Sequence, residues 1–122
     1  MRLLDDARFA GLFLPGSRAE VSIVGWVEIA GKTVRVSGQI DRLVVIQSAV
    51  LIADYKSDRS PPSRIEDIPP KYVEQLALYR AVLTKLYPEK SVHAALVWTE
   101  VAEIMEVSSD MIEGQLLGIT PA

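Results

Sequence analysis

The sequence predicts an α/β fold in which helices flank a mixed β-sheet. Segments rich in β-branched and aromatic residues alternate with segments whose apolar residues recur at every third or fourth position. These two patterns are typical of strands and of amphipathic helices. The chain of 122 residues also has the length of one domain, since domains commonly run about 100–150 residues. We therefore expect residues 1–122 to form a single domain with the element order α-β-β-β-α-β-(β)-α.

The first half of the chain predicts one helix followed by three strands. Residues 2–14 carry Leu and Ala at helical spacing and end before a Pro-Gly pair, which stops a helix. The three strands are expected at residues 19–30, 33–46 and 50–56. The third strand is apolar on both faces until Asp54, and this pattern is typical of a central strand that is covered on both sides.

The second strand alternates between two kinds of side chain. Its small and apolar residues share one face: Val34, Val36, Gly38 and Ile40. Its polar residues share the other face: Arg35, Ser37, Gln39 and Asp41. Because successive side chains of a strand point to opposite faces, Asp41 is expected on the side opposite to Ile40.

The second half predicts a long loop, two helices and up to two strands. Residues 57–70 contain four prolines and predict the loop. The main helix is expected at residues 71–87, and a terminal helix at residues 109–117. The strands of this half are expected at residues 91–99 and, more briefly, 102–107. One stripe of the main helix is apolar or aromatic apart from a single amide: Tyr72, Gln75, Leu76, Tyr79, Leu83 and Leu86.

Composition excludes several classes of protein. The chain has no cysteine, so disulfides, thiol nucleophiles and cysteine-ligated iron–sulfur clusters are ruled out. No apolar run approaches the ~20 residues that span a bilayer, and Asp5 and Asp6 interrupt the place of a signal peptide. We expect a cytoplasmic protein with no membrane partner. The net charge of −3 does not suit a simple phosphate-coating DNA binder, whereas a metal-dependent nuclease concentrates carboxylates.

Two carboxylates and a lysine are the candidates for chemistry. Asp41 lies within an apolar strand, and Asp54 closes a buried one, which is costly unless the charges are paired or bind a cation. Lys56 follows Asp54 by two positions and shares its face. With the Tyr55 carbonyl, the carboxylates are hard oxygen ligands that suit Mg²⁺ or Mn²⁺. The alternative is that Asp41 is a strand-end turn residue and that Asp54 and Lys56 form a solvated pair.

Gln75 is a polar residue on the apolar stripe of the main helix. A buried amide needs hydrogen-bond partners. Those partners are either structural, through the backbone of a strand, or functional, at the carboxylates. The spacing leaves both possibilities open.

Three motifs together carry a resemblance to a known family. They are Gly38-Gln39-Ile40-Asp41-Arg42-Leu43, Asp54-Tyr55-Lys56-Ser57, and Tyr72-x-x-Gln75 continuing to Tyr79-Arg80. This combination resembles the nuclease domain of the RecB-like branch of the PD-(D/E)XK superfamily. It is most similar to the carboxy-terminal nuclease domain of AddA, a subunit of the AddAB helicase–nuclease. The resemblance runs from about residue 9 to residue 107.

The resemblance implies a restriction-endonuclease-like core and a role for each motif. Asp41, Asp54 and the Tyr55 carbonyl would ligate Mg²⁺, with Mn²⁺ as an alternative, and Lys56 would support the attacking water and the developing phosphorane charge. Gln75 and Tyr79 would orient the site, with Tyr72, Tyr79 and Arg80 toward the DNA. The reaction would be exonucleolytic hydrolysis of DNA phosphodiesters during the processing of double-strand-break ends. The partners would be duplex ends, unwound strands and an AddB-like subunit; ATP would serve only a helicase motor that this chain lacks.

The sequence departs from the family in one respect. Members carry a metal-ligating His on a helix before the first strand, whereas residues 2–14 contain none and His93 lies in another element. We therefore expect a piece of a longer protein whose metal site lacks one ligand and whose isolated activity is weak or absent. The alternative is a non-catalytic DNA-holding or subunit-interface module with a vestigial site.

Overall fold

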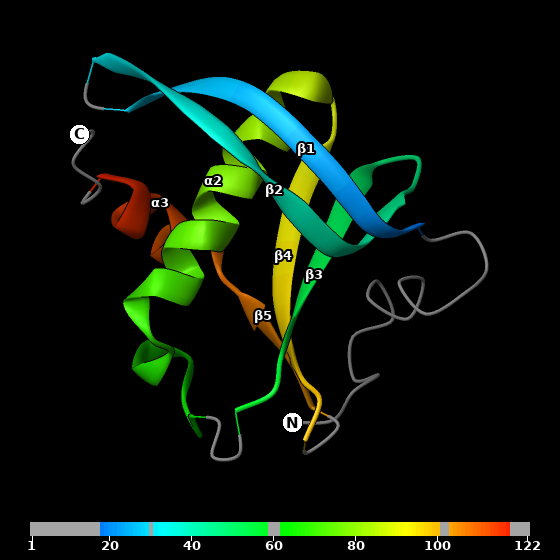
Figure 1. Ribbon diagram of the computed structural model, residues 1–122, viewed down its shortest axis with the longest axis vertical. Coiled ribbons are helices and arrows are strands. Elements are labelled where there is room, and N and C mark those ends of the chain that lie inside the picture. The colour runs from blue at the N-terminus through cyan, green and yellow to red at the C-terminus, as the bar shows by residue number, and fades with distance from the viewer. Residues whose placement is uncertain (1–17, 30, 59–61, 101–102, 118–122) are drawn as a thin grey trace.

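The computed structural model describes residues 18–29, 31–58, 62–100 and 103–117 as a five-stranded mixed sheet with helices (Figure 1). The elements are β1 (Arg18–Ile29), β2 (Lys32–Val45), β3 (Ala49–Lys56), a short 3₁₀ turn (Ile65–Asp67), α2 (Pro70–Leu86), β4 (Ser91–Trp98), β5 (Glu103–Val107) and α3 (Ser109–Leu117). The α/β class and the order of these elements are as the sequence predicts. The helix expected at residues 2–14 lies outside the described residues.

The strands lie in the order β1-β2-β3-β4-β5. Neighbouring strands are antiparallel except β3 and β4, which are parallel. A parallel pair needs a crossover connection, and α2 provides it between β3 and β4. Figure 1 shows α2 and α3 side by side against one face of the sheet. The carboxyl end of β3 lies near the first turns of α2, because Lys56 contacts both Tyr72 and Gln75.

The central strand β3 is covered on both faces, as its sequence predicts. Val50 and Ile52 belong to the large apolar cluster beneath α2, whereas Leu51 and Ala53 belong to a second cluster on the opposite face. Each of these four residues is at most 1% exposed. Burial of apolar surface is the main stabilising contribution to a fold, so β3 is held firmly between two apolar layers.

Helix α2 begins at Pro70, where the missing backbone N–H costs little. It ends at Leu86, and the Tyr87 N–H bonds the Leu83 carbonyl. The predicted stripe faces the sheet except at the last turn, because Leu86 is 63% exposed. That part of the prediction is wrong, because Leu86 borders an open hollow between β1, β2 and the end of α2. Among the described residues, no helix is long and apolar enough to cross a bilayer.

Candidate active site

The end of β3 carries a buried carboxylate and a lysine. Asp54 is the only polar or charged residue that is buried in the described part of the chain, and it is 6% exposed. Lys56 lies two positions further on the same face, and its Nζ is 2.5 Å from Asp54 Oδ2. The Lys56 carbonyl accepts hydrogen bonds from Thr99 N and Oγ1, at 2.9 and 3.1 Å. The backbone of this lysine is thus tied to the end of β4, as its side chain is tied to Asp54.

Asp41 comes to Asp54 from the neighbouring strand. The β2–β3 register pairs Leu43 with Ile52 and Arg42 with Ala53, so the next position places Asp41 beside Asp54. Asp41 Oδ2 accepts a 2.8 Å hydrogen bond from the Tyr55 backbone N–H. Burial raises the pKa of Asp54, and the hydrogen bond and negative charge of Asp41 raise it further against the opposing effect of Lys56. The two predicted carboxylates therefore share one small region.

The strand alternation predicted for Asp41 is wrong at this point. Ile40 and Leu43 both belong to the cluster beneath α2, although they lie three positions apart, so the alternation changes phase between them. The register position opposite Asp41 holds Glu20 of β1, which has φ of 55°. This local irregularity lets the Asp41 carboxylate reach Asp54 while Ile40 stays in the core.

We expect Glu20→Asn to stabilise the protein by about 1 kcal/mol, because asparagine tolerates the left-handed region better than glutamate. Thermal and urea denaturation at neutral pH would measure the change. Glu28→Asn is the matched control, since Glu28 is also exposed on β1 but does not have positive φ. A gain of the same size in both variants would show that charge, rather than backbone strain, is responsible.

Gln75 of α2 connects the lysine to a buried tyrosine. Its Oε1 accepts a hydrogen bond from Lys56 Nζ at 3.2 Å, and its Nε2 donates to the Tyr79 hydroxyl at 3.3 Å. The amide therefore finds its partners in the candidate site, not in the backbone of a strand. Tyr79 is 6% exposed, so its hydroxyl fixes Gln75 from inside the protein.

Gly38 of β2 makes room for Tyr79. A Cβ at this glycine would lie 2.9 Å from both Cε1 and Cζ of Tyr79, and it would meet the hydroxyl oxygen even more closely. Real Cβ atoms essentially never approach other atoms this closely. The glycine of the first motif and the tyrosine of the third are therefore in direct contact.

Tyr72 covers the lysine from the first turn of α2. Lys56 Nζ lies 4.3 Å from the centroid of the Tyr72 ring, a favourable position for a cation over an aromatic face. The Tyr72 hydroxyl donates to Asp58 at 3.1 Å. Burial, and secondarily Asp58, raise the pKa of Tyr72, so the hydroxyl remains a donor. Sequence reasoning missed Asp58, because it lies in a loop without periodicity and no spacing links it to Tyr72.

Two residues considered from the sequence do not join this group. The Arg80 guanidinium donates to the Val92 carbonyl at 3.3 Å and lies 3.8 Å from Glu113 of α3. It therefore links α2 to β4 and α3, and this placement does not support the expected role of Arg80 in DNA binding. His93 contacts Ser91 and Glu106, and its register partner is Leu51, three residues before Asp54. As expected, the histidine stands apart from the carboxylates.

The donor set fits a hard divalent cation. No group of three or more His, Cys, Asp and Glu residues that could hold a metal occurs within the described ranges. Two carboxylates and the Tyr55 carbonyl are nevertheless enough for Mg²⁺, which usually keeps several waters and takes one or two protein carboxylates. Asp54 Oδ2 is buried and has no hydrogen bond of good geometry, only its ion pair with Lys56. This oxygen has acceptor capacity that a cation could use.

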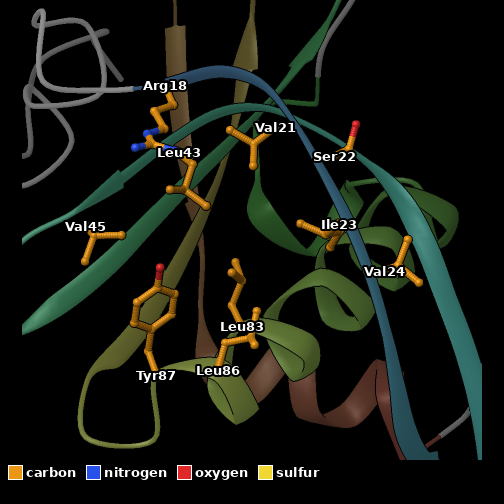
Figure 2. A pocket seen from close by; sticks show the side chains of 10 residues that line it. All are labelled: Arg18, Val21, Ser22, Ile23, Val24, Leu43, Val45, Leu83, Leu86 and Tyr87. Atoms are coloured by element: carbon orange, nitrogen blue, oxygen red, sulfur yellow. The ribbon is translucent and has the colours of Figure 1, made fainter.

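Two hollows differ in their relation to these residues. The larger, of about 520 Å³, lies between β1, the end of β2 and the end of α2 (Figure 2). Its lining includes Leu43, Leu83 and Tyr87 but none of the candidate site residues. The smaller, of about 360 Å³, lies between β2 and the first turns of α2, and both Gln75 and Tyr79 line it. Only the smaller of these two hollows is continuous with the candidate site.

Comparisons with known proteins identify a family for this chain. No curated protein matches the chain. Among solved structures, the chain is similar to one described as "Crystal structure of SSO0001", with 14% sequence identity and a TM-score of 0.49. That similarity covers 88% of this chain and 50% of the other, so this chain spans half the length of that protein. Residues 6–114, which are most of the sequence, match the profile of one family. The chain belongs to the PD-(D/E)XK nuclease superfamily.

Proposed function

We propose that this chain is a Mg²⁺-dependent DNA exonuclease domain that hydrolyses phosphodiester bonds. Members of its superfamily are typically nucleases that use divalent ions. The observation that carries the proposal is the meeting of Asp41, Asp54 and Lys56 at the end of β3. The two carboxylates can bind a cation, and the ammonium group can contact the phosphate that the cation binds.

Asp41, Asp54 and the Tyr55 carbonyl would hold the cation in this proposal. A bound Mg²⁺ would supply Lewis-acid polarisation of the phosphate and acidify a water. The raised pKa of Asp54 favours the same assignment. It means that the ionised form of this buried carboxyl, beside a second carboxylate, is disfavoured. A bound cation would stabilise that form. The Tyr55 side chain takes no part, since its hydroxyl accepts a hydrogen bond from Arg42 at 3.3 Å.

Lys56 would stabilise the negative charge that develops on the phosphate. Water attacks the phosphorus, the ester P–O bond breaks, and the products are a phosphate monoester and a hydroxyl group. The ammonium can donate to a phosphate oxygen throughout this change. Gln75 and Tyr72 fix its direction by a hydrogen bond of 3.2 Å and a ring contact of 4.3 Å. Tyr79 acts one step further out by holding Gln75.

We further propose a place for this domain in the AddA branch of the RecB-like nucleases. The support is the resemblance of the three motifs and their spacing. The substrate would then be the ends of broken DNA duplexes and their unwound strands, and the reaction would prepare them for recombinational repair. A helicase motor that uses ATP, an AddB-like subunit and a cytoplasmic location belong to the same proposal.

A non-catalytic role is the second candidate, and one observation favours it. Lys56 already lies on Asp54, and only two carboxylates meet at the described site. A DNA-holding or subunit-interface module with a vestigial site would keep this neutralised arrangement. Such a module would bind no divalent cation through Asp41.

Calorimetric titration with Mn²⁺ separates the two candidates. A functional site binds the ion in the wild-type protein and loses the binding in Asp41→Asn. At a concentration of 100 times Kd, the ion should stabilise the wild type by about 2.7 kcal/mol, seen as a rise in Tm. Asp67→Asn is the control, because Asp67 is exposed and pairs with Arg64 outside the site. Mn²⁺ binding that survives Asp41→Asn would contradict the assignment.

Cleavage of end-labelled DNA in the presence of Mg²⁺ completes this test. Because one expected ligand is missing, the proposal expects the label to be released only slowly, as short products, and expects none with EDTA or in Asp41→Asn. An absence of both Mn²⁺ binding and cleavage would favour the non-catalytic module.

A further inference from the structure

The hollow beside Gln75 and Tyr79 has walls from two elements. Arg35, Val36 and Ser37 of β2 form one wall, and α2 provides the other with Lys71, Glu74, Gln75, Leu78 and Tyr79. We call it the β2–α2 groove. Its volume of about 360 Å³ is at the lower end of the range of ligand-binding pockets, roughly 300–1,000 Å³. It has room for a single small unit of a ligand, and its apolar side chains can contact a flat or ring-shaped group.

Basic side chains lie between the groove and the candidate site. Arg35 and Lys71 stand on opposite walls, in a protein whose net charge is −3. Lys71 Nζ lies 5.5 Å from the Tyr72 ring centroid, and the same ring lies 4.3 Å from Lys56 Nζ. Positive charge is therefore arranged along a path from Arg35 through Lys71 to Lys56. An anionic chain, rather than a single anion, would match such a path.

The groove and the carboxylates also lie along one strand. Ser37 lines the groove and Asp41 follows it by four positions on β2, a span of about 13 Å at the usual rise of a strand. A stacked nucleic-acid strand advances about 3.4 Å per nucleotide, so roughly four nucleotides cover this span. Gln75 joins the two places directly, because it lines the groove and bonds Lys56.

We propose that the β2–α2 groove binds the sugar–phosphate backbone of a single nucleic-acid strand, about four nucleotides from the cation-binding carboxylates. This inference rests on the proposed function for its direction toward Asp41 and Asp54. Arg35 and Lys71 contact phosphates, and the half-buried Leu78 offers an apolar surface to a sugar or base. Positively charged grooves with apolar or aromatic surfaces are the general device for holding single strands. A duplex is too wide to enter a hollow of this volume.

The effect of removing Glu74 distinguishes binding in the groove from an effect of net charge alone. Glu74 is half-buried and lines the same groove, where its negative charge opposes a phosphate. Removal of this charge should therefore strengthen the binding of a strand. An effect of net charge alone would be the same for any exposed carboxylate, such as Glu28 on β1.

Fluorescence anisotropy with a labelled 12-nucleotide DNA strand tests the groove. The measurement is made in EDTA, so that neither cleavage nor the cation site affects the result. We expect Arg35→Gln and Lys71→Gln each to weaken binding about fivefold. Each should also lower the slope of log K against log salt by about 0.7, the value for one phosphate on a single strand. Glu74→Gln should tighten binding about twofold, with Glu28→Gln as its control.

Lys32→Gln is the matched control for the cations, because Lys32 is exposed on β2 but does not line the groove. Arg35, Lys71, Lys32 and Glu28 are exposed and Glu74 is half-buried, so circular dichroism should show an unchanged fold. Equal effects of Lys32→Gln and Arg35→Gln would overturn the proposal, and so would tighter binding of a 12-base-pair duplex than of the strand. If the groove is correct but the nuclease assignment is not, the variants weaken strand binding while Mg²⁺ produces no cleavage. If only the nuclease assignment is correct, DNA is cleaved and the groove variants bind normally.

Discussion

Lys56→Ala is expected to lower the rate of DNA cleavage by about a thousandfold. Removal of one preorganised donor to a developing oxyanion typically costs 10²–10³ in kcat, and Lys56 is the ammonium that Asp54, Gln75 and Tyr72 hold at the end of β3. Asp41 and Asp54 remain in place, so a divalent cation should still bind. The loss should therefore appear in kcat, with affinity for DNA and Mn²⁺ largely retained. Steady-state kinetics with a labelled DNA strand would measure the two separately.

The same variant should change the response of the protein to metal. Without the ammonium, the buried Asp54 carboxylate has no counter-charge, and an unpaired buried charge is destabilising. Lys56→Ala should therefore melt at a lower temperature than the wild type in EDTA and recover with Mn²⁺. Lys85→Ala is the control, because Lys85 lies on the same helix as Gln75 but bonds only the Trp26 carbonyl among the described residues. Activity within tenfold of the wild type in Lys56→Ala would contradict the proposed mechanism.

Gly38→Ala is expected to destabilise the protein by about 2–3 kcal/mol. Extra atoms in a well-packed core typically cost 1–3 kcal/mol, and here the new Cβ would meet a rigid ring rather than a flexible chain. Tyr79 cannot move without losing its hydrogen bond to Gln75. At this chain length the change lowers Tm by roughly 10 °C. Urea denaturation would give the free energy of unfolding.

Two further glycines make this experiment specific. Gly25→Ala should cost less, because its Cβ would meet Val82 at 2.9 Å, a shallower overlap than the one with the Tyr79 hydroxyl at Gly38. Gly114→Ala should stabilise α3 by about 0.5–1 kcal/mol, since nothing lies within 4 Å of the added carbon. In the double variant Gly38→Ala, Tyr79→Ala, the two costs should not add, because the clash disappears. Simple additivity would show that the contact between Gly38 and Tyr79 is not the cause.

The sequence was most informative where residue pattern and burial coincide. The apolar run that ends at Asp54 predicted a central strand with a buried charge, and Asp54 is buried at the end of such a strand. The two-residue spacing placed Lys56 on the same face as Asp54. The short connection between the second and third strands allowed Asp41 to lie beside Asp54. These inferences follow from local periodicity, which one strand expresses by itself.

The remaining features depend on contacts between distant segments. The side-chain alternation of β2 changes phase at Asp41, opposite the positive φ of Glu20. No residue pattern within β2 predicts this change. The partners of Gln75 were open because an amide on a helix can turn to either side. Arg80 was expected at the DNA because it is basic, but charge does not determine which carbonyl a guanidinium reaches. Asp58 lies in a loop, and only the fold brings it to Tyr72.

In the ion pair between Lys56 and Asp54, a side chain of the protein balances the charge of a buried carboxylate without a metal ion. Many small metalloproteins, such as zinc fingers, cannot fold until their ion arrives, because nothing else balances their ligands. Here a side chain of the protein already supplies a positive charge. Under the proposed function, folding would therefore not depend on the metal, and a bound cation would take over from Lys56 the balance of charge at Asp54.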